Sequence, residues 1–335
     1  MKELKKQLKN IRFLLEYTVI IIPYHAIRLL PRFLMRGLSS FVSFAAYSLA
    51  PGIRKLIQAN LKAAFPEKDD AEISRIARKS FHHTIYNFFD FIWMMGKPKR
   101  IAKYTHLPPP VFKLLRDCVE SDTRILFVNP HLGSWEGSGV IAANTASIRL
   151  AAIAKATHNP YLNNLLNKDN RERSGIKIIF SKGAIRDSLK CLNEGYSLGL
   201  LIDQNTRVRD GGTFVNMFGL PVASSRSPAM LWHYCETNNI PSKIIYGTTL
   251  RENDRLVAHS AILSKPYSEY AGDDEIIQEL MDITESFIRR YPEQYLWLYR
   301  RFQYIPPDAP DEVKARYPYY ARVPDPKFFR QKVAQ

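Results

Sequence analysis

The chain has 335 residues, of which 46% are hydrophobic and 24% charged, and its formal net charge at pH 7 is +16. This composition excludes a disordered chain, and the length suffices for one large hydrophobic core with an appended segment. The excess of positive charge predicts an acidic partner, which can be nucleic acid, anionic lipid or an acidic carrier protein. Three widely separated cysteines, without the spacing of a zinc site, predict reduced thiols in the core.

The N-terminal region combines a basic start with two apolar stretches, at residues 13–27 and 37–53. Neither stretch reaches the roughly 20 apolar residues that comfortably span a bilayer. We interpret residues 1–53 as a membrane anchor that either spans the bilayer once with tilt or lies in its interface. The alternative is a pair of buried helices in a soluble domain. The lysines and arginines at the start of the chain favour the cytoplasmic side for this end.

Two helices are predicted before the centre of the chain. Helical periodicity covers residues 54–64, and Asp69 with Glu72 resembles a capping box for a second helix over 70–95. The pair His82-His83 lies on this otherwise core-like helix, and we interpret it as structural.

From residue 124 onward, short apolar runs alternate with helical segments. Strands are predicted at 125–128, 148–154, 176–180, 198–202, 243–248 and 256–263, and helices at 135–144, 159–173, 184–193, 227–238 and 274–291. This alternation predicts an α/β fold, with a mainly parallel mixed sheet covered by helices on both faces. We expect one domain over residues 54–302, followed by a Pro/Tyr-rich tail over 303–335 without regular structure.

The clearest candidate for chemistry is the segment 129–136, Asn-Pro-His-Leu-Gly-Ser-Trp-Glu, directly after a predicted strand. The carboxyl ends of parallel strands are where α/β proteins bind their ligands. His131 is therefore a candidate general base, and Glu136, in the first turn of the next helix, is expected to orient its ring. The alternative is a surface histidine near a helix N-terminus, with Glu136 placed there to suit the helix dipole.

A second polar cluster, Asp203, Gln204 and Asn205, follows the predicted strand at 198–202. Its side chains either hold the headgroup of a substrate or brace the His131 loop, and a polar turn is the alternative. Guanidinium groups suit phosphate better than ammonium groups do. Four arginines are therefore candidates for binding phosphate or substrate: Arg171, Arg173, Arg207 and Arg209. The alternative is that they form a solvated basic face.

The segment around His131 resembles the HxxxxE signature of the bacterial lipid A late (secondary) acyltransferases, within the lysophospholipid acyltransferase superfamily. Glycerolipid members usually carry HxxxxD, so Glu136 favours the lipid A branch. Other segments are similar to the same family in the same order along nearly the whole chain, at 60–67, 158–160, 171–175, 203–205, 212–219 and 295–302. Asn205 is a departure, because family members often carry aspartate there.

The resemblance implies transfer of a fatty acyl group from the thioester of acyl carrier protein to a hydroxyl of a lipid A precursor, which forms an acyloxyacyl unit. His131 and Glu136 are then the catalytic residues, and no metal or cofactor is required. The implied partners are acyl carrier protein, the lipid A precursor and the cytoplasmic side of the cell inner membrane.

One rival enzyme uses the same base on a lysophospholipid or another hydroxylated lipid. A rival of another class is a basic protein that binds membrane or nucleic acid without catalysis. The chain lacks the aromatic–basic pattern of a recognised nucleic-acid module, so no nucleic-acid partner is expected.

Overall fold

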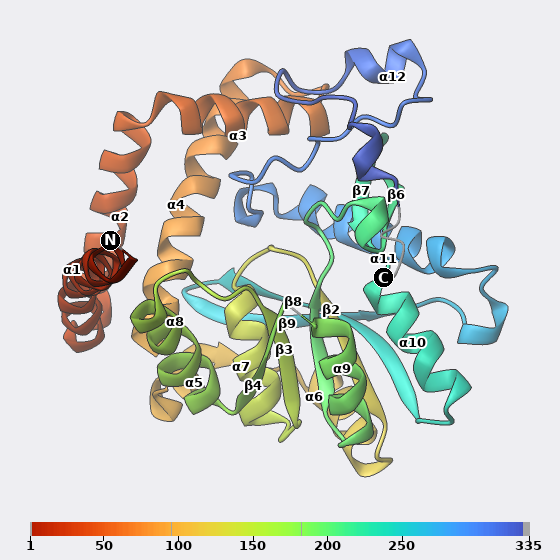
Figure 1. The fold of residues 1–335 in the computed structure, drawn as a ribbon, viewed down its shortest axis with the longest axis horizontal. Coiled ribbons are helices and arrows are strands. Elements are labelled where there is room, and N and C mark those ends of the chain that lie inside the picture. Colours follow the sequence, from red (N-terminus) through yellow and green to blue (C-terminus); the bar gives the residue numbers. More distant parts are fainter. Residues whose placement is uncertain (1, 95, 182, 331–335) are drawn as a thin grey trace.

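The computed structural model describes residues 2–94, 96–181 and 183–330, and it contains a seven-stranded sheet flanked by helices (Figure 1). The strand order is β1-β9-β8-β2-β5-β3-β4, and every neighbouring pair is parallel except β8 with β9. This arrangement confirms the predicted mainly parallel α/β sheet. The strands are β1 (Thr105–His106), β2 (Arg124–Asn129), β3 (Leu150–Ala154), β4 (Ile176–Phe180), β5 (Ser197–Leu201), β8 (Ser242–Glu252) and β9 (Arg255–Ile262).

The central strand β2 divides the interior into two apolar cores, because alternate side chains of a strand point to opposite faces. Leu126 and Val128 join the core that also holds apolar side chains of α9, α10 and α11, whereas Ile125 and Phe127 join the core formed with α6 and α7. Both faces of the sheet are therefore covered, as predicted. The helices of this region are α5 (Pro98–Tyr104), α6 (Pro109–Glu120), α7 (Trp135–Thr145), α8 (Pro160–Leu166), α9 (Ala184–Asn193), α10 (Ser227–Thr237) and α11 (Asp273–Arg290).

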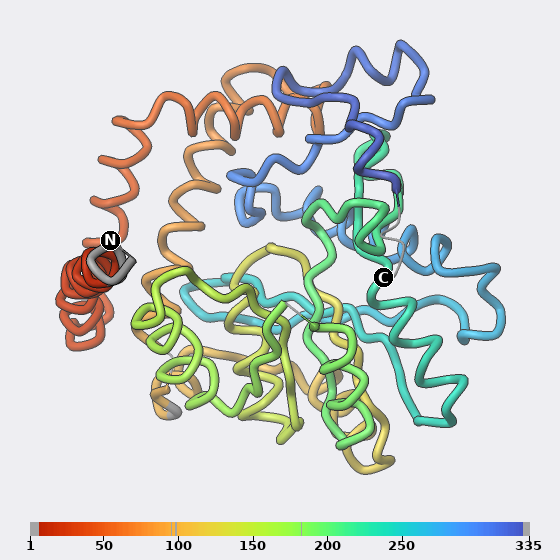
Figure 2. Tube along the Cα trace, in the orientation of Figure 1, coloured from red at the N-terminus to blue at the C-terminus, as the bar shows by residue number. Residues whose placement is uncertain are grey.

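Four helices precede the sheet: α1 (Lys2–Leu29), α2 (Arg32–Leu49), α3 (Pro51–Ala64) and α4 (Asp70–Met94). The Glu72 backbone N–H donates to Asp69 Oδ1 at 2.8 Å, which confirms the predicted cap of α4. Met95, the last residue predicted for this helix, lies outside the described residues. In Figures 1 and 2, α1 and α2 lie at the left edge of the molecule, and α4 separates them from the sheet.

The outer faces of α1 and α2 carry large apolar side chains that no other part of the described chain covers. Seven that are at least two-thirds exposed are Val19, Ile22, Leu29, Phe33, Phe41, Phe44 and Leu49. The alternative of two buried helices is therefore wrong. Within residues 2–94, 96–181 and 183–330, no helix alone is long and apolar enough to cross a bilayer, whereas α2 and α3 together are, with a bend of 92° between them. The membrane anchor stays a prediction.

An antiparallel hairpin, β6 (Gly212–Met217) with β7 (Leu220–Ser225), was not predicted from the sequence. Its turn residues Phe218 and Gly219 have φ angles of 55° and 69°, the left-handed pair that two-residue hairpin turns require. Gly219, the second residue of this turn, was the local sequence signal for it.

The tail contains one short helix, α12 (Asp311–Ala315), and a 3-10 turn at Pro326–Phe328. The Phe328 ring packs against Phe214 of β6, with centroids 5.9 Å apart, so the tail returns to the hairpin. Residues 331–335 of the predicted tail lie outside the described residues, and the division at residues 53 and 302 stays a prediction.

Candidate active site

The loop between β2 and α7 is held by backbone contacts on three sides. The Gly133 N–H donates to the Gln294 carbonyl at 2.9 Å, and the Ser134 N–H donates to the Thr249 carbonyl at 2.7 Å. The Asn87 side-chain amide of α4 donates to the Gly133 carbonyl at 2.5 Å. The loop is therefore fixed by α4, by β8 and by the segment after α11.

Glycine is required at position 133. Its φ is +60°, and a Cβ atom built there would lie 2.1 Å from the Thr249 carbonyl oxygen. We expect Gly133→Ala to lower the free energy of unfolding by about 3 kcal/mol, through backbone strain and displacement of β8. Thermal or denaturant unfolding measures this change. The matched control is Gly52→Ala, where a Cβ meets nothing within 4 Å and the expected change is within about 1 kcal/mol. Equal stability of the two variants would contradict the prediction.

His131 is buried at the carboxyl end of β2, and its partner is Asp203. The ring Nδ1 lies 2.7 Å from Asp203 Oδ1, and the His131 backbone N–H donates to Asp203 Oδ2 at 2.8 Å. A carboxylate can only accept, so the bond assigns the proton to Nδ1. The lone pair of Nε2 then faces the side-chain amide of Gln204, whose nitrogen lies 3.2 Å away.

The electrostatics of this pair are set by burial and by mutual attraction. Burial lowers the pKa of His131, but the Asp203 carboxylate outweighs it, so the pKa lies above its ordinary value. Burial raises the pKa of Asp203, but the charge and hydrogen bonds of His131 outweigh it, so that pKa is lowered. Arg301, which is buried and donates to the Ala223 carbonyl, adds positive charge on the Asp203 side.

Contrary to the expectation from the sequence, Glu136 does not orient His131. Its two carboxylate oxygens accept from Arg171, with Nε–Oε2 at 3.1 Å and Nη2–Oε1 at 2.5 Å. Arg171 also donates to Asn167 Oδ1 at 2.7 Å. The expectation was wrong because the arginine, 35 residues further along the chain, gives the carboxylate a two-pronged partner that the imidazole cannot match.

His131 opens into a cavity of about 920 Å³ between the sheet and α7. His131, Glu136, Arg171 and Gln204 all contribute polar groups to its wall. The remaining wall is mainly apolar and comes from α6, α7 and one face of the sheet, including Val111, Ile141, Leu150, Ala152, Ile178 and Gly199. A cavity of this kind suits an apolar ligand with one reactive polar end.

The family model for bacterial lipid A biosynthesis acyltransferases matches residues 1–304. The chain belongs to that family. The comparison with curated protein sequences gave no match. This lipid A biosynthesis acyltransferase therefore catalyses acyl transfer, and a lipid A precursor is its class of substrate. The resemblance predicted from the sequence is confirmed.

Some of the predicted site residues of this acyltransferase line the cavity at His131, and others lie away from it. Asn205 lines the cavity, but its side-chain nitrogen donates to the Arg300 carbonyl at 2.8 Å and its Oδ1 accepts from Arg301 at 3.3 Å. The cluster 203–205 thus braces the loops, one of the two roles expected for it. Arg173, exposed on the surface, pairs with Asp169.

Two further predicted arginines also turn away from the reacting groups. Arg207 pairs with Asp210 at 2.5 Å, and Arg209 donates to the Lys327 carbonyl at 3.0 Å. Tyr295, which is not among the site residues predicted from the sequence, is buried beside Asp203. Its pKa is raised by burial and then by the charge of Asp203. Its place in the 295–302 segment was the only sequence signal.

The acyltransferase has no group of three or more His, Cys, Asp or Glu side chains placed to hold a metal ion within residues 2–94, 96–181 and 183–330. Cys118, Cys191 and Cys235 are free and buried, which confirms the prediction of core thiols. None of the three thiols lines the cavity at His131.

Proposed function

We propose that this acyltransferase moves a fatty acyl group from the thioester of acyl carrier protein to a hydroxyl of a lipid A precursor. The observation that carries the proposal is a buried imidazole, backed by Asp203, in the wall of a large and mainly apolar cavity. An acyl chain fits the apolar part, while its thioester carbon lies near the imidazole. The acceptor hydroxyl belongs to a 3-hydroxyacyl chain, so the product is an acyloxyacyl unit.

His131 is the proposed general base. Its Nε2 takes the hydroxyl proton as the oxygen attacks the thioester carbonyl, and the same proton passes to the departing thiol as the carbon–sulfur bond breaks. The incoming hydroxyl takes the place of the Gln204 amide, which lies 3.2 Å from Nε2. Asp203 holds the tautomer and stabilises the imidazolium.

Glu136 and Arg171 have a positioning role in this scheme. Their paired charges line the same cavity as His131 and leave little net charge in this part of its wall. The pair also ties α7 to the turn at Asn167–Arg171. A free phosphate ligand at Arg171 is not what this geometry favours, because Glu136 and Asn167 already engage the guanidinium.

The surface suits a membrane substrate. The exposed apolar faces of α1 and α2 provide an area for contact with acyl chains, and the net charge of +16 favours anionic lipid headgroups and an acidic carrier protein. We place the catalytic domain at the cytoplasmic side of the inner membrane.

Mass spectrometry of lipids tests the proposal. Purified full-length protein is incubated with acyl carrier protein thioesters and a tetra-acylated lipid A precursor, with a lysophospholipid offered in parallel. A mass gain of one acyl chain on the lipid A precursor supports the proposal. Acylation of the lysophospholipid alone would replace the proposed acceptor. The unacylated carrier protein serves as the control for carry-over of lipid.

A further inference from the structure

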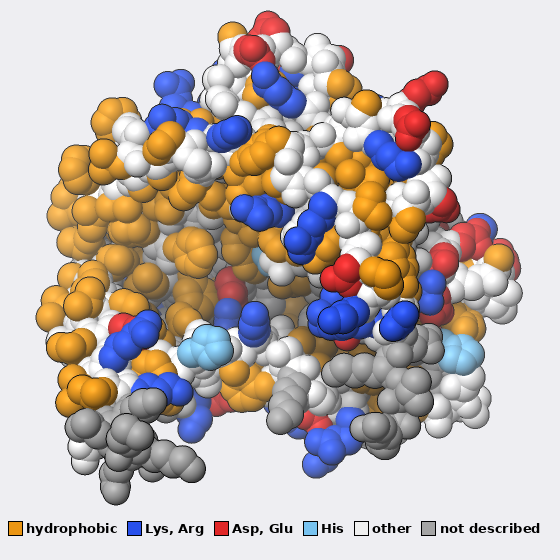
Figure 3. Space-filling view, turned by 45° about the horizontal axis from the view of Figure 1, so that its top comes forward, with side chains coloured by type: hydrophobic (Ala, Val, Ile, Leu, Met, Phe, Trp, Pro, Cys, Tyr) orange, Lys and Arg blue, Asp and Glu red, His pale blue; other side chains and the backbone are white. Residues whose placement is uncertain are grey.

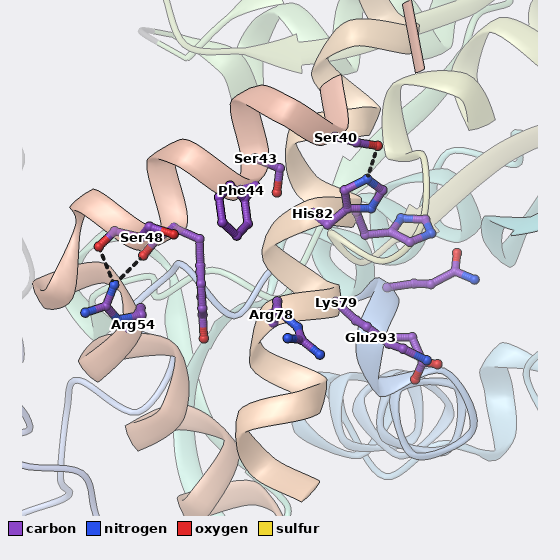
Figure 4. Close-up of a pocket in the computed structure, with 12 residues that line it drawn as sticks. Ser40, Ser43, Phe44, Ser48, Arg54, Arg78, Lys79, His82 and Glu293 are labelled. Carbon is purple, nitrogen blue, oxygen red and sulfur yellow. Dashed lines mark hydrogen bonds between the residues drawn. The ribbon is translucent and has the colours of Figure 1, made fainter. Parts of the chain in front are cut away.

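A second cavity, of about 830 Å³, lies between α2, α3, α4 and the turn at Pro292–Gln294 (Figure 4). Three cationic side chains, Arg54, Arg78 and Lys79, face one carboxylate, Glu293, on its walls. Figure 4 shows Arg54 and Arg78 flanking the space below Phe44, from α3 and α4 respectively. The cavity is separate from the one at His131, because the two share none of their lining residues.

The cations of this cavity differ in how they are held. Arg54 donates through Nη1 to the carbonyls of Tyr47 and Ser48, both at 2.6 Å, so the last turn of α2 positions it. Arg78 and Lys79 are exposed on α4 and make no ion pair with any residue of the described ranges. By contrast, Arg75 and Lys62 nearby are paired with Glu72 and Asp70. Two unpaired cations therefore remain available to an anionic ligand.

The histidines do not add to this charge. Burial, followed by the charge of Arg251, lowers the pKa of both His82 and His83, to about 3 for His83. His82 contacts the Ser40 hydroxyl at 3.0 Å, whereas the buried Nδ1 of His83 has no hydrogen-bond partner among the described residues. From the sequence this pair is interpreted as structural, but both rings form part of the cavity wall.

The surroundings of the cavity are apolar. Phe44 and Tyr47 line it, and Phe44 is 71% exposed and continues the outer face of α2. Figure 3 shows hydrophobic side chains gathered beside a hollow in the surface, with Lys and Arg side chains around it. A ligand that fits both properties has an anionic head and hydrocarbon chains.

We propose that this cavity binds the phosphate group of a lipid, through Arg54, Arg78 and Lys79, with the lipid chains lying along α2. Guanidinium and ammonium groups are the usual protein ligands of phosphate, and the exposed apolar face suits chains in a bilayer. The lipid is either the phosphorylated acceptor or an anionic phospholipid of the membrane.

The cavity adjoins the active-site loop. Gln294 lines it, and the Gln294 carbonyl accepts from the Gly133 N–H at 2.9 Å. On α4, His83 lies one turn before Asn87, which donates to the Gly133 carbonyl. The cavity and the His131 loop therefore share Gln294 as a common neighbour.

Binding of a short-chain lipid tests the site without relying on the proposed function. The full-length protein, in micelles of a maltoside detergent, is titrated with dihexanoyl phosphatidate and, in parallel, with uncharged dihexanoylglycerol and inorganic phosphate. We expect Arg78→Gln/Lys79→Gln to weaken phosphatidate binding about ten- to hundredfold, the loss typical of two charge-assisted contacts. The matched control, Lys62→Gln/Arg75→Gln, removes the same charge outside the cavity and should bind within about twofold of the parent.

The proposal would be overturned if the two double variants bound phosphatidate equally well. It would also be overturned if the parent bound dihexanoylglycerol as tightly as phosphatidate. Acyl-transfer kinetics of the Arg78→Gln/Lys79→Gln variant then distinguish the phosphorylated acceptor from membrane phospholipid. Only this step rests on the proposed function. A KM increase confined to the phosphorylated acceptor, absent for its dephosphorylated form, assigns the acceptor. Weaker flotation with anionic vesicles at unchanged KM assigns membrane phospholipid. A KM increase for acyl carrier protein alone, with phosphatidate binding unchanged, would contradict the proposal.

Discussion

The His131→Ala variant is expected to lose at least about 10²–10⁴-fold of kcat, the contribution typical of a general base. Without Nε2, the two neighbouring carboxylates do not replace the base, because Asp203 lies behind the ring and Glu136 is paired with Arg171. Rates of acyl transfer to the lipid A precursor, at saturating donor, measure this loss.

Folding has to be separated from catalysis in this test, because the change leaves a buried carboxylate without its partner. His131→Gln keeps a hydrogen-bond donor for Asp203 and is expected to be as inactive as the alanine variant while unfolding near the parent temperature. His106→Gln, at an exposed position on β1, is the matched control and should retain full activity. Near-normal turnover by His131→Gln would rule out the base.

The Asp203→Asn variant is expected to lose on the order of 10³–10⁴-fold of kcat, as is typical when the carboxylate that orients a catalytic histidine becomes an amide. The pH profile should change in a defined direction. The base works only when neutral, so kcat/KM rises with pH through the pKa of His131, which Asp203 holds above its ordinary value. Removing the carboxylate lowers that pKa, so the acid limb of the profile moves to lower pH.

Glu136→Gln is the comparison that distinguishes the two carboxylates. It leaves the bond between His131 and Asp203 in place and removes only a weaker, longer-range contribution to the pKa of the imidazole. We expect a smaller shift of the acid limb than in Asp203→Asn. A larger shift in Glu136→Gln would mean that Glu136, rather than Asp203, is the carboxylate that acts on the base.

Local patterns predicted most of the regular structure. The six predicted strands correspond to strands of the sheet because buried parallel strands appear in sequence as short apolar runs. The helix predicted over 159–173 is interrupted: α8 ends at Leu166 and a π-helical turn follows at Asn167–Arg171. That irregular turn carries Arg171 to Glu136, a contact that helical periodicity does not reveal.

The sequence by itself determined the family, the α/β class and the place of His131 at a strand end, because each depends on residue order and local periodicity. Only the tertiary structure decided which carboxylate serves the imidazole. Positions 131 and 136 are close in sequence, whereas 131 and 203 meet because β2 and β5 are neighbours in a parallel sheet, where strand ends share one edge. Side-chain partners across such an edge depend on strand order and packing, so spacing along the chain favoured the wrong pair.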